Sequence, residues 1–106
     1  MFARRVYMHL KPNTAADFTH KLEKEVIPVL RKQKGFLDEI SFVAPSGIEA
    51  FAISLWDRPE SAEAYNRASY PEVTKTLASV IDGPAQVETF NVANSTFHKI
   101  AAAVTV

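Results

Sequence analysis

The stretch WDRPESAEAYNRASYPEV, residues 56–73, contains one pattern twice: Asp57 or Ser69, a spacer residue, a Pro and a Glu. An Asp or Ser oxygen accepts a free backbone N–H at the start of a helix, and a Glu three residues later reaches back to cap the same end. Pro is tolerated in the first turn because its missing N–H would have no partner there. The pattern therefore predicts two short helices, beginning near Pro59 and Pro71, in place of one long helix.

Neither face of the strand before this stretch is suited to contact with water. In AFAISLW, residues 50–56, Phe, Ile and Leu alternate with Ala, Ala, Ser and Trp. A strand that is apolar on both faces lies in the middle of a sheet and is covered twice. Helices of the same chain can cover one face, and a second copy of the chain is the simplest cover for the other. We therefore expect a homodimer.

Three further segments have the two-residue period of strands. Residues 2–10 and 36–44 alternate between apolar and polar, and residues from 86 to about 100 are interpreted as the last strand. The short turn Pro45-Ser46-Gly47 joins the second strand to the third, residues 48–57, as a hairpin. All four strands are expected in one antiparallel sheet.

Between the first two strands the sequence predicts one long helix. Apolar residues recur at helical spacing over residues 13–34, and Gly35 is placed to end the helix. Pro28 lies inside it and should kink it or leave one backbone bond unmade. The order βαββαβ with a broken second helix predicts an α+β, ferredoxin-like plait. The sequence leaves open whether the small, apolar tail at 101–106 is ordered.

Composition limits the class of protein. The 106 residues predict a single domain, 1–106, with a modest core. Acidic and basic residues balance at 12 each, so nothing indicates binding to nucleic acid or to an anionic membrane surface. Cys is absent, the His residues have no ligand spacing, and no apolar run reaches the ~18 residues of a membrane span. We expect a soluble, cytoplasmic protein without a metal site.

Three aromatic residues surround the predicted helix break: Trp56 at the end of the central strand, and Tyr65 and Tyr70 on the helices. Ala52 and Ser54, on the same strand face as Trp56, are small and leave room for a flat ligand. Aromatic walls with a few polar atoms suit planar phenolic or quinone compounds. The alternative for Trp56 is core packing, which is common for an aromatic residue at a strand end.

Two other residues are candidates for chemistry. Arg4 is a charge on the otherwise apolar face of the first strand, so burial there requires a partner such as a carboxylate or a deprotonated ligand. Alternatively, the Arg4 side chain extends to water at the end of the strand. His98 has a suitable pKa for a base, although a His on a terminal strand is commonly a surface or interface residue. Asn66 and Arg67 are expected to be solvated.

The sequence resembles the antibiotic biosynthesis monooxygenase domain family of the dimeric α+β barrel superfamily. The resemblance rests on LKPNTAADF at 10–18, KGFLDEISF at 34–42 and above all ISLWDRPESAEAYNRASYPEV at 53–73. It implies a homodimer whose sheets meet back to back in a barrel, with a ligand cleft between sheet and helices in each subunit. It also implies oxygenation of aromatic phenols or quinols without a flavin or a metal, because the deprotonated substrate itself delivers an electron to O2.

The family residues transfer only in part. A Trp at the place of Trp56 lies in the pocket of such enzymes, but the Asn that some of them have four residues earlier is Ala52 in this sequence. Other members of the family degrade heme with an Asn on the first strand, a Trp on the helix and a His ten residues later. Here Tyr65 replaces that Trp, and no His occurs between His20 and His98. The resemblance therefore disfavours heme binding.

We predict a cofactor-independent monooxygenase that oxidises a small phenolic, quinol or polyketide-like aromatic compound with O2. Arg4 is expected to stabilise the substrate oxyanion, and His98 is the candidate base. The residues expected to bind the substrate lie on one strand face and on the broken helix: Ala52, Ser54, Trp56, Tyr65 and Tyr70. The alternative is a non-catalytic dimeric module of the same fold that binds a small molecule or serves a stress response.

Overall fold

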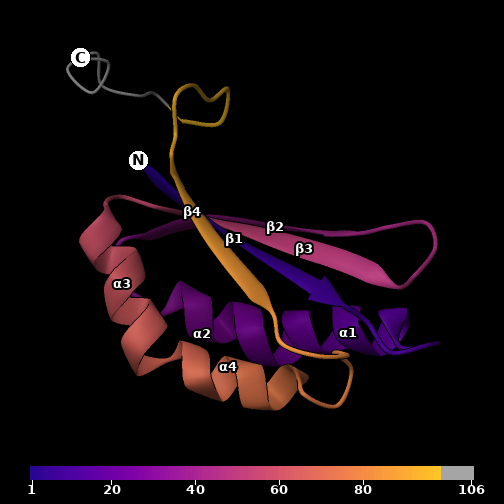
Figure 1. Ribbon diagram of the computed structural model, residues 1–106. Coiled ribbons are helices and arrows are strands. Elements are labelled where there is room, and N and C mark those ends of the chain that lie inside the picture. Colours follow the sequence, from indigo (N-terminus) through magenta and orange to yellow (C-terminus); the bar gives the residue numbers. More distant parts are fainter. Residues whose placement is uncertain (99–106) are drawn as a thin grey trace.

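A computed structural model describes residues 1–98 of the chain, which form a four-stranded antiparallel sheet and a layer of helices (Figure 1). The strands are β1 (Phe2–His9), β2 (Phe36–Val43), β3 (Glu49–Trp56) and β4 (Gln86–Asn91), in the order β2-β3-β1-β4. The helices are α1 (Ala15–Lys21), η1 (Leu22–Val26), α2 (Ile27–Arg31), α3 (Pro59–Ala68) and α4 (Tyr70–Leu77). This arrangement confirms the predicted ferredoxin-like α+β plait.

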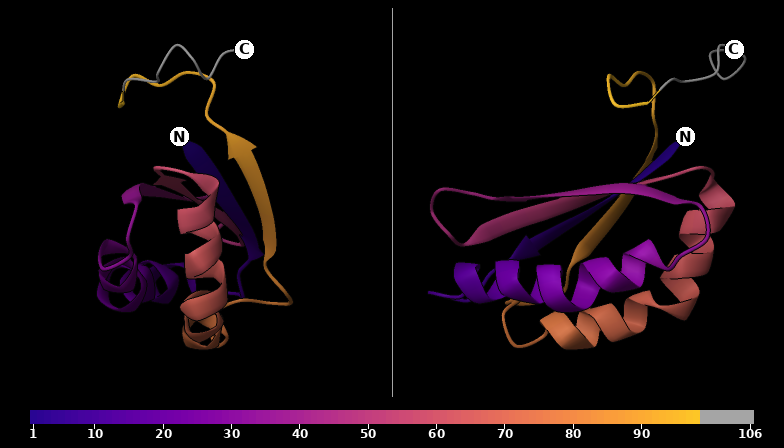
Figure 2. Two further views of the ribbon diagram at one scale, coloured as in Figure 1. Left: turned by 90° about the vertical axis from the view of Figure 1, so that its left-hand side faces the viewer. Right: turned by 180° about the vertical axis from the view of Figure 1, so that it is seen from behind.

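The two faces of the sheet differ. Figures 1 and 2 show all the helices against one face, which we call the helix face, while the chain after β4 leaves toward the side of the other, which we call the open face. Successive side chains of a strand point to opposite faces. On β3 the helix face receives the buried Ala50, Ser54 and Trp56, and the open face receives the partly buried Phe51, Ile53 and Leu55. Within residues 1–98, no helix is long and apolar enough to cross a membrane.

The last strand is shorter than predicted. It was expected to reach about residue 100, but β4 ends at Asn91 because its antiparallel partner β1 begins at Phe2, directly opposite. Residues 92–98 continue without helix or strand. The tail at 101–106 lies outside the described residues.

The predicted break between two short helices is present at Ser69, where α3 ends and α4 begins. Pro71 has no N–H to donate to the carbonyl four residues earlier, so one continuous helix could not complete its bonding there. The predicted capping is wrong, because neither helix has a side-chain cap and the N-cap of α3 is Arg58. The Asp57 carboxylate instead accepts a hydrogen bond from the Ser61 hydroxyl, which lowers the pKa of Asp57.

Pro28 is accommodated by a π-helical turn. The helix predicted over residues 13–34 is divided into α1, η1 and α2, and Pro28 lies at the start of α2, directly after η1. A Pro ring crowds the carbonyl four residues earlier, here that of Lys24, and supplies no N–H to it. The wider π-helical turn shifts the hydrogen-bond ladder by one residue at this point. The irregularity expected at Pro28 is therefore a π-bulge.

Gly35 does not end the helix as predicted, because α2 ends at Arg31; it lies in the turn before β2, and its replacement is the first prediction. It has a φ of 83°, and a Cβ there would overlap the Asp57 carboxylate and the Ser61 side chain. We expect Gly35→Ala to lower the free energy of unfolding by about 2 to 4 kcal/mol, from left-handed backbone strain and overpacking together. Urea denaturation of both proteins measures the difference.

The matched control is Gly47→Ala in the hairpin turn. Gly47 also has a positive φ, of 77°, but no atom lies within 4 Å of the Cβ position. This variant should therefore lose only the strain contribution of about 1 to 2 kcal/mol. Equal losses in the two variants would contradict the role of close packing at Gly35.

Candidate functional site

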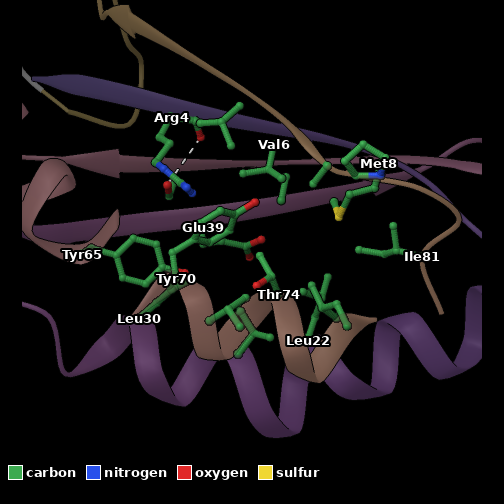
Figure 3. Close-up of a pocket in the computed structure, with 18 of the residues that line it drawn as sticks. Arg4, Val6, Met8, Leu22, Leu30, Glu39, Tyr65, Tyr70, Thr74 and Ile81 are labelled. Atoms are coloured by element: carbon green, nitrogen blue, oxygen red, sulfur yellow. Dashed lines mark hydrogen bonds between the residues drawn. The ribbon is translucent and has the colours of Figure 1, made fainter. Parts of the chain in front are cut away.

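A cavity of about 420 Å³ lies between the helix face of the sheet and the helical segments η1 and α4 (Figure 3). Its size is in the range of small-molecule sites in proteins. Most of its wall is apolar, with Val6 and Met8 of β1 facing Leu22 of η1 and Leu77 of α4. The polar side chains that reach it are Arg4, Glu39, Ser54, Tyr65, Tyr70 and Thr74.

The structure brings together five of the seven residues that the sequence nominated. They come from β1, β3, α3 and α4 and line one wall and the floor of the cavity: Arg4, Ala52, Ser54, Tyr65 and Tyr70. The break between α3 and α4 positions the two tyrosines, because Tyr65 is on the last turns of one helix and Tyr70 is the first residue of the next. The ring centroids of Tyr65 and Tyr70 are 6.2 Å apart.

Arg4 is buried, with only 4% of its surface exposed, so its side chain does not extend to water. Its Nη2 donates a hydrogen bond of 2.8 Å to Oδ1 of Asn66. Its guanidinium carbon lies 4.1 Å from the ring centroid of Tyr70 and 5.3 Å from that of Tyr65. No carboxylate forms an ion pair with it within residues 1–98. Arg4 is thus a buried cation whose partners are neutral, at the edge of the cavity.

Asn66 differs from its prediction. It was expected to be a solvated helix residue, but it is partly buried and its side-chain oxygen accepts the bond from Arg4. Asn66 is on the same face of α3 as Ala62, four residues earlier, which is part of the core. It therefore fixes the direction of the guanidinium.

Glu39 of β2 is a cavity residue that the sequence analysis missed. The register pairs Arg4 with Ser54 across β1 and β3, and Ser54 with Glu39 across β3 and β2. The three side chains therefore stand in one row on the helix face. Figure 3 shows Glu39 and Arg4 reaching into the same space from the sheet.

The length of the hairpin turn explains why Glu39 was missed. A three-residue turn at 45–47 would pair Ala44 with Ile48 and would place Glu39 opposite Ile53, on the open face. The turn has four residues, because the N–H of Ala44 bonds to the carbonyl of Glu49. A shift of one residue in register turns every side chain of a strand to the other face.

Burial raises the pKa of Glu39, and a hydrogen bond from the Ser41 hydroxyl partly opposes this effect. A carboxyl group with a raised pKa is a stronger base than an ordinary one. Burial also raises the pKa of Tyr65 to about 12, although the charge on Arg4 lowers it in part. Tyr65 is therefore a neutral phenol near pH 7, able to donate or accept a hydrogen bond but not to serve as the base.

Trp56 does not line the cavity, which corrects its predicted place in the wall. It is fully buried, with 0% of its surface exposed, and its ring centroid lies 5.3 Å from that of Tyr65 and 5.6 Å from that of Phe36. Its Nε1 donates a hydrogen bond of 2.9 Å to Oγ of Ser54. Trp56 thus lies one layer behind the cavity and supports Tyr65 and Ser54, as the core-packing alternative anticipates.

His98 does not lie in the cavity either. Its ring pairs with the carboxylate of Asp38, and it borders a separate hollow with Ile53 and Leu55 on the open face. Arg4 points to the helix face, so the sheet lies between these two predicted catalytic residues. The cause is the early end of β4, after which the chain leaves the cavity side (Figure 1).

Comparison with known proteins adds the fold relationship. No protein-family model matches the sequence, and no curated protein does. The monooxygenase from the gene ActVA-Orf6 of Streptomyces coelicolor, in complex with the ligand nanaomycin D, matches with a TM-score of 0.77 at 16% identity, over 92% of this chain and 92% of that one. SnoaB, a cofactor-independent oxygenase from Streptomyces nogalater, matches with a TM-score of 0.72 at 10% identity, over 90% of this chain and 95% of that one.

The chain has the fold of these oxygenases. The expected likeness to the antibiotic biosynthesis monooxygenase structures is thus confirmed for the fold. NE2512, a protein of unknown function from Nitrosomonas europaea, also matches, with a TM-score of 0.70 at 14% identity, over 95% of this chain and 94% of that one. A fold does not by itself decide the reaction, because one fold can serve many functions. The chemistry must therefore be argued from the cavity.

Proposed function

We propose that the protein is a cofactor-independent monooxygenase that oxidises a small phenolic, quinol or polyketide-like aromatic compound with O2 in the cavity of the helix face. The observation that carries this proposal is Arg4, a buried cation with no carboxylate partner in residues 1–98, directed by Asn66 at the edge of an apolar cavity. Burying a charge without a counter-charge is costly, so the arrangement is best suited to an anionic ligand group. A phenolate or enolate oxygen beside the guanidinium supplies that charge.

Such an anion can reduce O2 directly. The substrate loses a hydroxyl proton, transfers an electron to O2 and then forms a carbon–oxygen bond, and loss of water from the resulting hydroperoxide yields a quinone carbonyl. Both oxygen atoms are accounted for, one in the product and one in water, and the substrate supplies all the electrons. Within this scheme Arg4 holds the anion, and the apolar wall around Met8 and Leu77 excludes water from it. The two oxygenases that share the fold support this chemistry.

The test is O2 consumption with a panel of anthrones, hydroquinones and simple phenols, measured with no added flavin, heme or metal. The proposal predicts uptake well above the spontaneous rate for at least one polycyclic substrate, with one O2 consumed for each quinone formed. Protein heated until unfolded serves as the control for autoxidation. Uptake at the spontaneous rate with every compound would contradict the proposal.

A non-catalytic binding module is the second candidate, and it is favoured by Ala52. The Asn found at this position in some oxygenases of the family is absent, which removes one polar contact from the cavity. Equilibrium dialysis separates the two candidates, because a binding module should retain an aromatic ligand without consuming O2.

We also propose that a second copy of the chain covers the open face. Three large apolar residues there are strongly exposed: Ile40 at 46%, Phe42 at 41% and Phe90 at 50%. Ile40 and Phe42 lie beside the partly buried Ile53 and Phe51 of the central strand, and Phe90 lies beside Ala3 of β1. Two charged residues of the same face, Arg5 and Glu88, pair with each other. Exposed apolar residues gathered on one face in this way are typical of a protein–protein interface. Sedimentation at micromolar concentration should therefore give about twice the 11.8 kDa monomer mass.

Ile53→Lys tests this dimer. A Lys in the middle of the open face should weaken association at least about 100-fold, corresponding to a residue worth ~2.7 kcal/mol at an interface centre. The matched control is Ala64→Lys on the exposed side of α3, which adds the same charge away from the open face. The contrary result is a wild-type protein that sediments as a monomer at micromolar concentration, or an Ile53→Lys variant that remains dimeric.

A further inference from the structure

We propose that Glu39 is the general base of the site: its carboxylate removes the hydroxyl proton of the substrate while Arg4 holds the resulting anion. This inference rests on the proposed oxygenase function and adds the residue that generates the reactive anion. It also assigns the substrate class more closely, as an aromatic hydroxyl compound that is un-ionised in solution near pH 7 and ionises in the cavity.

The geometry comes from the sheet. Arg4, Ser54 and Glu39 occupy one row on three adjacent strands. Neighbouring strands are about 4.8 Å apart, so the outer two backbones of the row are separated by about 10 Å. Ser54, between them, is short and also lines the cavity, although its hydroxyl accepts a hydrogen bond from Trp56, whereas Arg and Glu are long enough to extend into the cavity from both sides. One aromatic hydroxyl above Ser54 can thus contact a cation on one side and a carboxylate on the other.

The surroundings favour Glu39 over every other titratable group in contact with the cavity. Tyr65 of α3 and Tyr70 of α4 are phenols, and Arg4 is a cation. The carboxylate of Asp38 and the ring of His98 pair with each other on the open face. Among the residues that line the cavity, Glu39 is therefore the one group that can accept a proton near neutral pH.

The proton and the electrons balance without an added co-reactant. The O–H bond of the substrate breaks and the proton moves to Glu39. The substrate anion then gives one electron to O2, and the two radicals combine through a new carbon–oxygen bond. Glu39 returns its proton to the peroxide oxygen, and loss of water completes the carbonyl, so the carboxylate is ready for the next turnover.

Glu39→Gln is the direct test, because it removes the base but keeps the shape of the side chain. Two substrates are compared by O2 uptake: a hydroquinone or phenol that is un-ionised at the assay pH, and an acidic phenol that is already ionised. With the first, kcat should fall at least about 100-fold, the usual contribution of a general base. With the second it should change only a fewfold, because no proton has to be removed. Glu23→Gln, on the exposed surface of η1, is the matched control and should behave as the wild type.

A second variant separates a base from a structural residue. The hydrogen bond from Ser41 lowers the pKa of Glu39, so Ser41→Ala should raise that pKa further. Turnover rises with pH as a general base becomes ionised. The rising limb of the kcat–pH profile should therefore move to higher pH in Ser41→Ala and disappear in Glu39→Gln. A loss of stability alone would move neither.

A binding measurement without O2 tests the base assignment independently of the oxygenase proposal. Wild-type protein should shift the ultraviolet spectrum of a bound phenol to that of its phenolate at a pH below the solution pKa of that phenol, because Arg4 stabilises the anion. In stopped-flow mixing the phenolate should form more slowly with Glu39→Gln than with the wild type. If no substrate consumes O2 but this difference in rate occurs, the oxygenase proposal fails and the base assignment stands. If Glu39→Gln matches the wild type with un-ionised substrates, in turnover or in the rate at which the bound phenolate forms, the inference is overturned.

Discussion

Replacing Arg4 with Met is expected to lower kcat/KM for an aromatic hydroxyl substrate at least about 100-fold, the cost of removing one stabiliser of a developing oxyanion. The folded chain should nevertheless be at least as stable as the wild type, because the guanidinium is buried without a carboxylate partner in residues 1–98. Exchanging such a charge for an apolar side chain of similar length is commonly neutral or stabilising. Steady-state O2 uptake and thermal unfolding together measure the two effects.

Arg4→Lys is the control for charge. A Lys keeps the positive charge but loses the planar group that stacks on Tyr70 at 4.1 Å and bonds to Asn66 at 2.8 Å. Its kcat/KM should therefore fall only about tenfold, or ~1.4 kcal/mol. If Arg4→Met retained full activity, or if it unfolded while Arg4→Lys did not, the cation would be a structural element and not a part of the site.

Replacing Trp56 with Ala should lower the free energy of unfolding by about 3 to 5 kcal/mol, which is the usual cost of truncating a large buried aromatic residue. Trp56 packs between Phe36 and Tyr65 and has no exposed surface, so the truncation leaves a cavity that the strand end cannot fill. Trp56→Phe keeps an aromatic ring and loses the hydrogen bond to Ser54, and it should cost only about 1 to 2 kcal/mol. Urea denaturation distinguishes these values.

Because Trp56 lies behind the cavity, Trp56→Phe should change kcat per folded molecule much less than Arg4→Met does. Phe18→Leu is the matched control, since Phe18 is equally buried on α1 and does not line the cavity. If Trp56→Phe abolished turnover with an intact fold, while Phe18→Leu did not, the indole would have to contact the substrate after a movement of Tyr65.

The fold could be predicted from the sequence because each helix and strand has a recognisable local sequence pattern. Pro59 and Pro71 define where the two short helices begin, and Pro28 indicates the irregularity that becomes η1. Part of the cavity wall could be predicted as well, because strict alternation along β3 places Ala52 and Ser54 on one face. Patterns of this kind depend only on the periods of helix and strand.

The positions of Glu39 and His98 depend on the lengths of the hairpin turn and of β4, which local sequence patterns do not determine. Glu39 was missed because the composition of the turn does not show whether it has three or four residues. The two lengths place the side chain of Glu39 on opposite faces of the sheet. His98 was placed wrongly because the end of β4 is decided by the length of its partner and not by its own residues. The sequence could not separate the two possible roles of Trp56, because a core position and a cavity wall both favour an aromatic residue at the end of a strand.

The four-residue turn between β2 and β3 has a consequence for how proteins of this architecture can diverge, because an irregularity lies at the other end of β2. The pairing shifts by one residue between Phe36 and Asp38, so Phe36 packs on the helix face against Trp56, while Ile40 and Phe42 beyond it supply the open face. Such a bulge absorbs one extra residue without disturbing the strand on its other side. Insertion or deletion of one residue in the hairpin turn can therefore rotate the outer part of β2 while Phe36 stays in place. A one-residue insertion that shifts the register would place Ile40 opposite Ser54, so that an apolar residue replaces the carboxylate of the cavity and the open face changes in the same step.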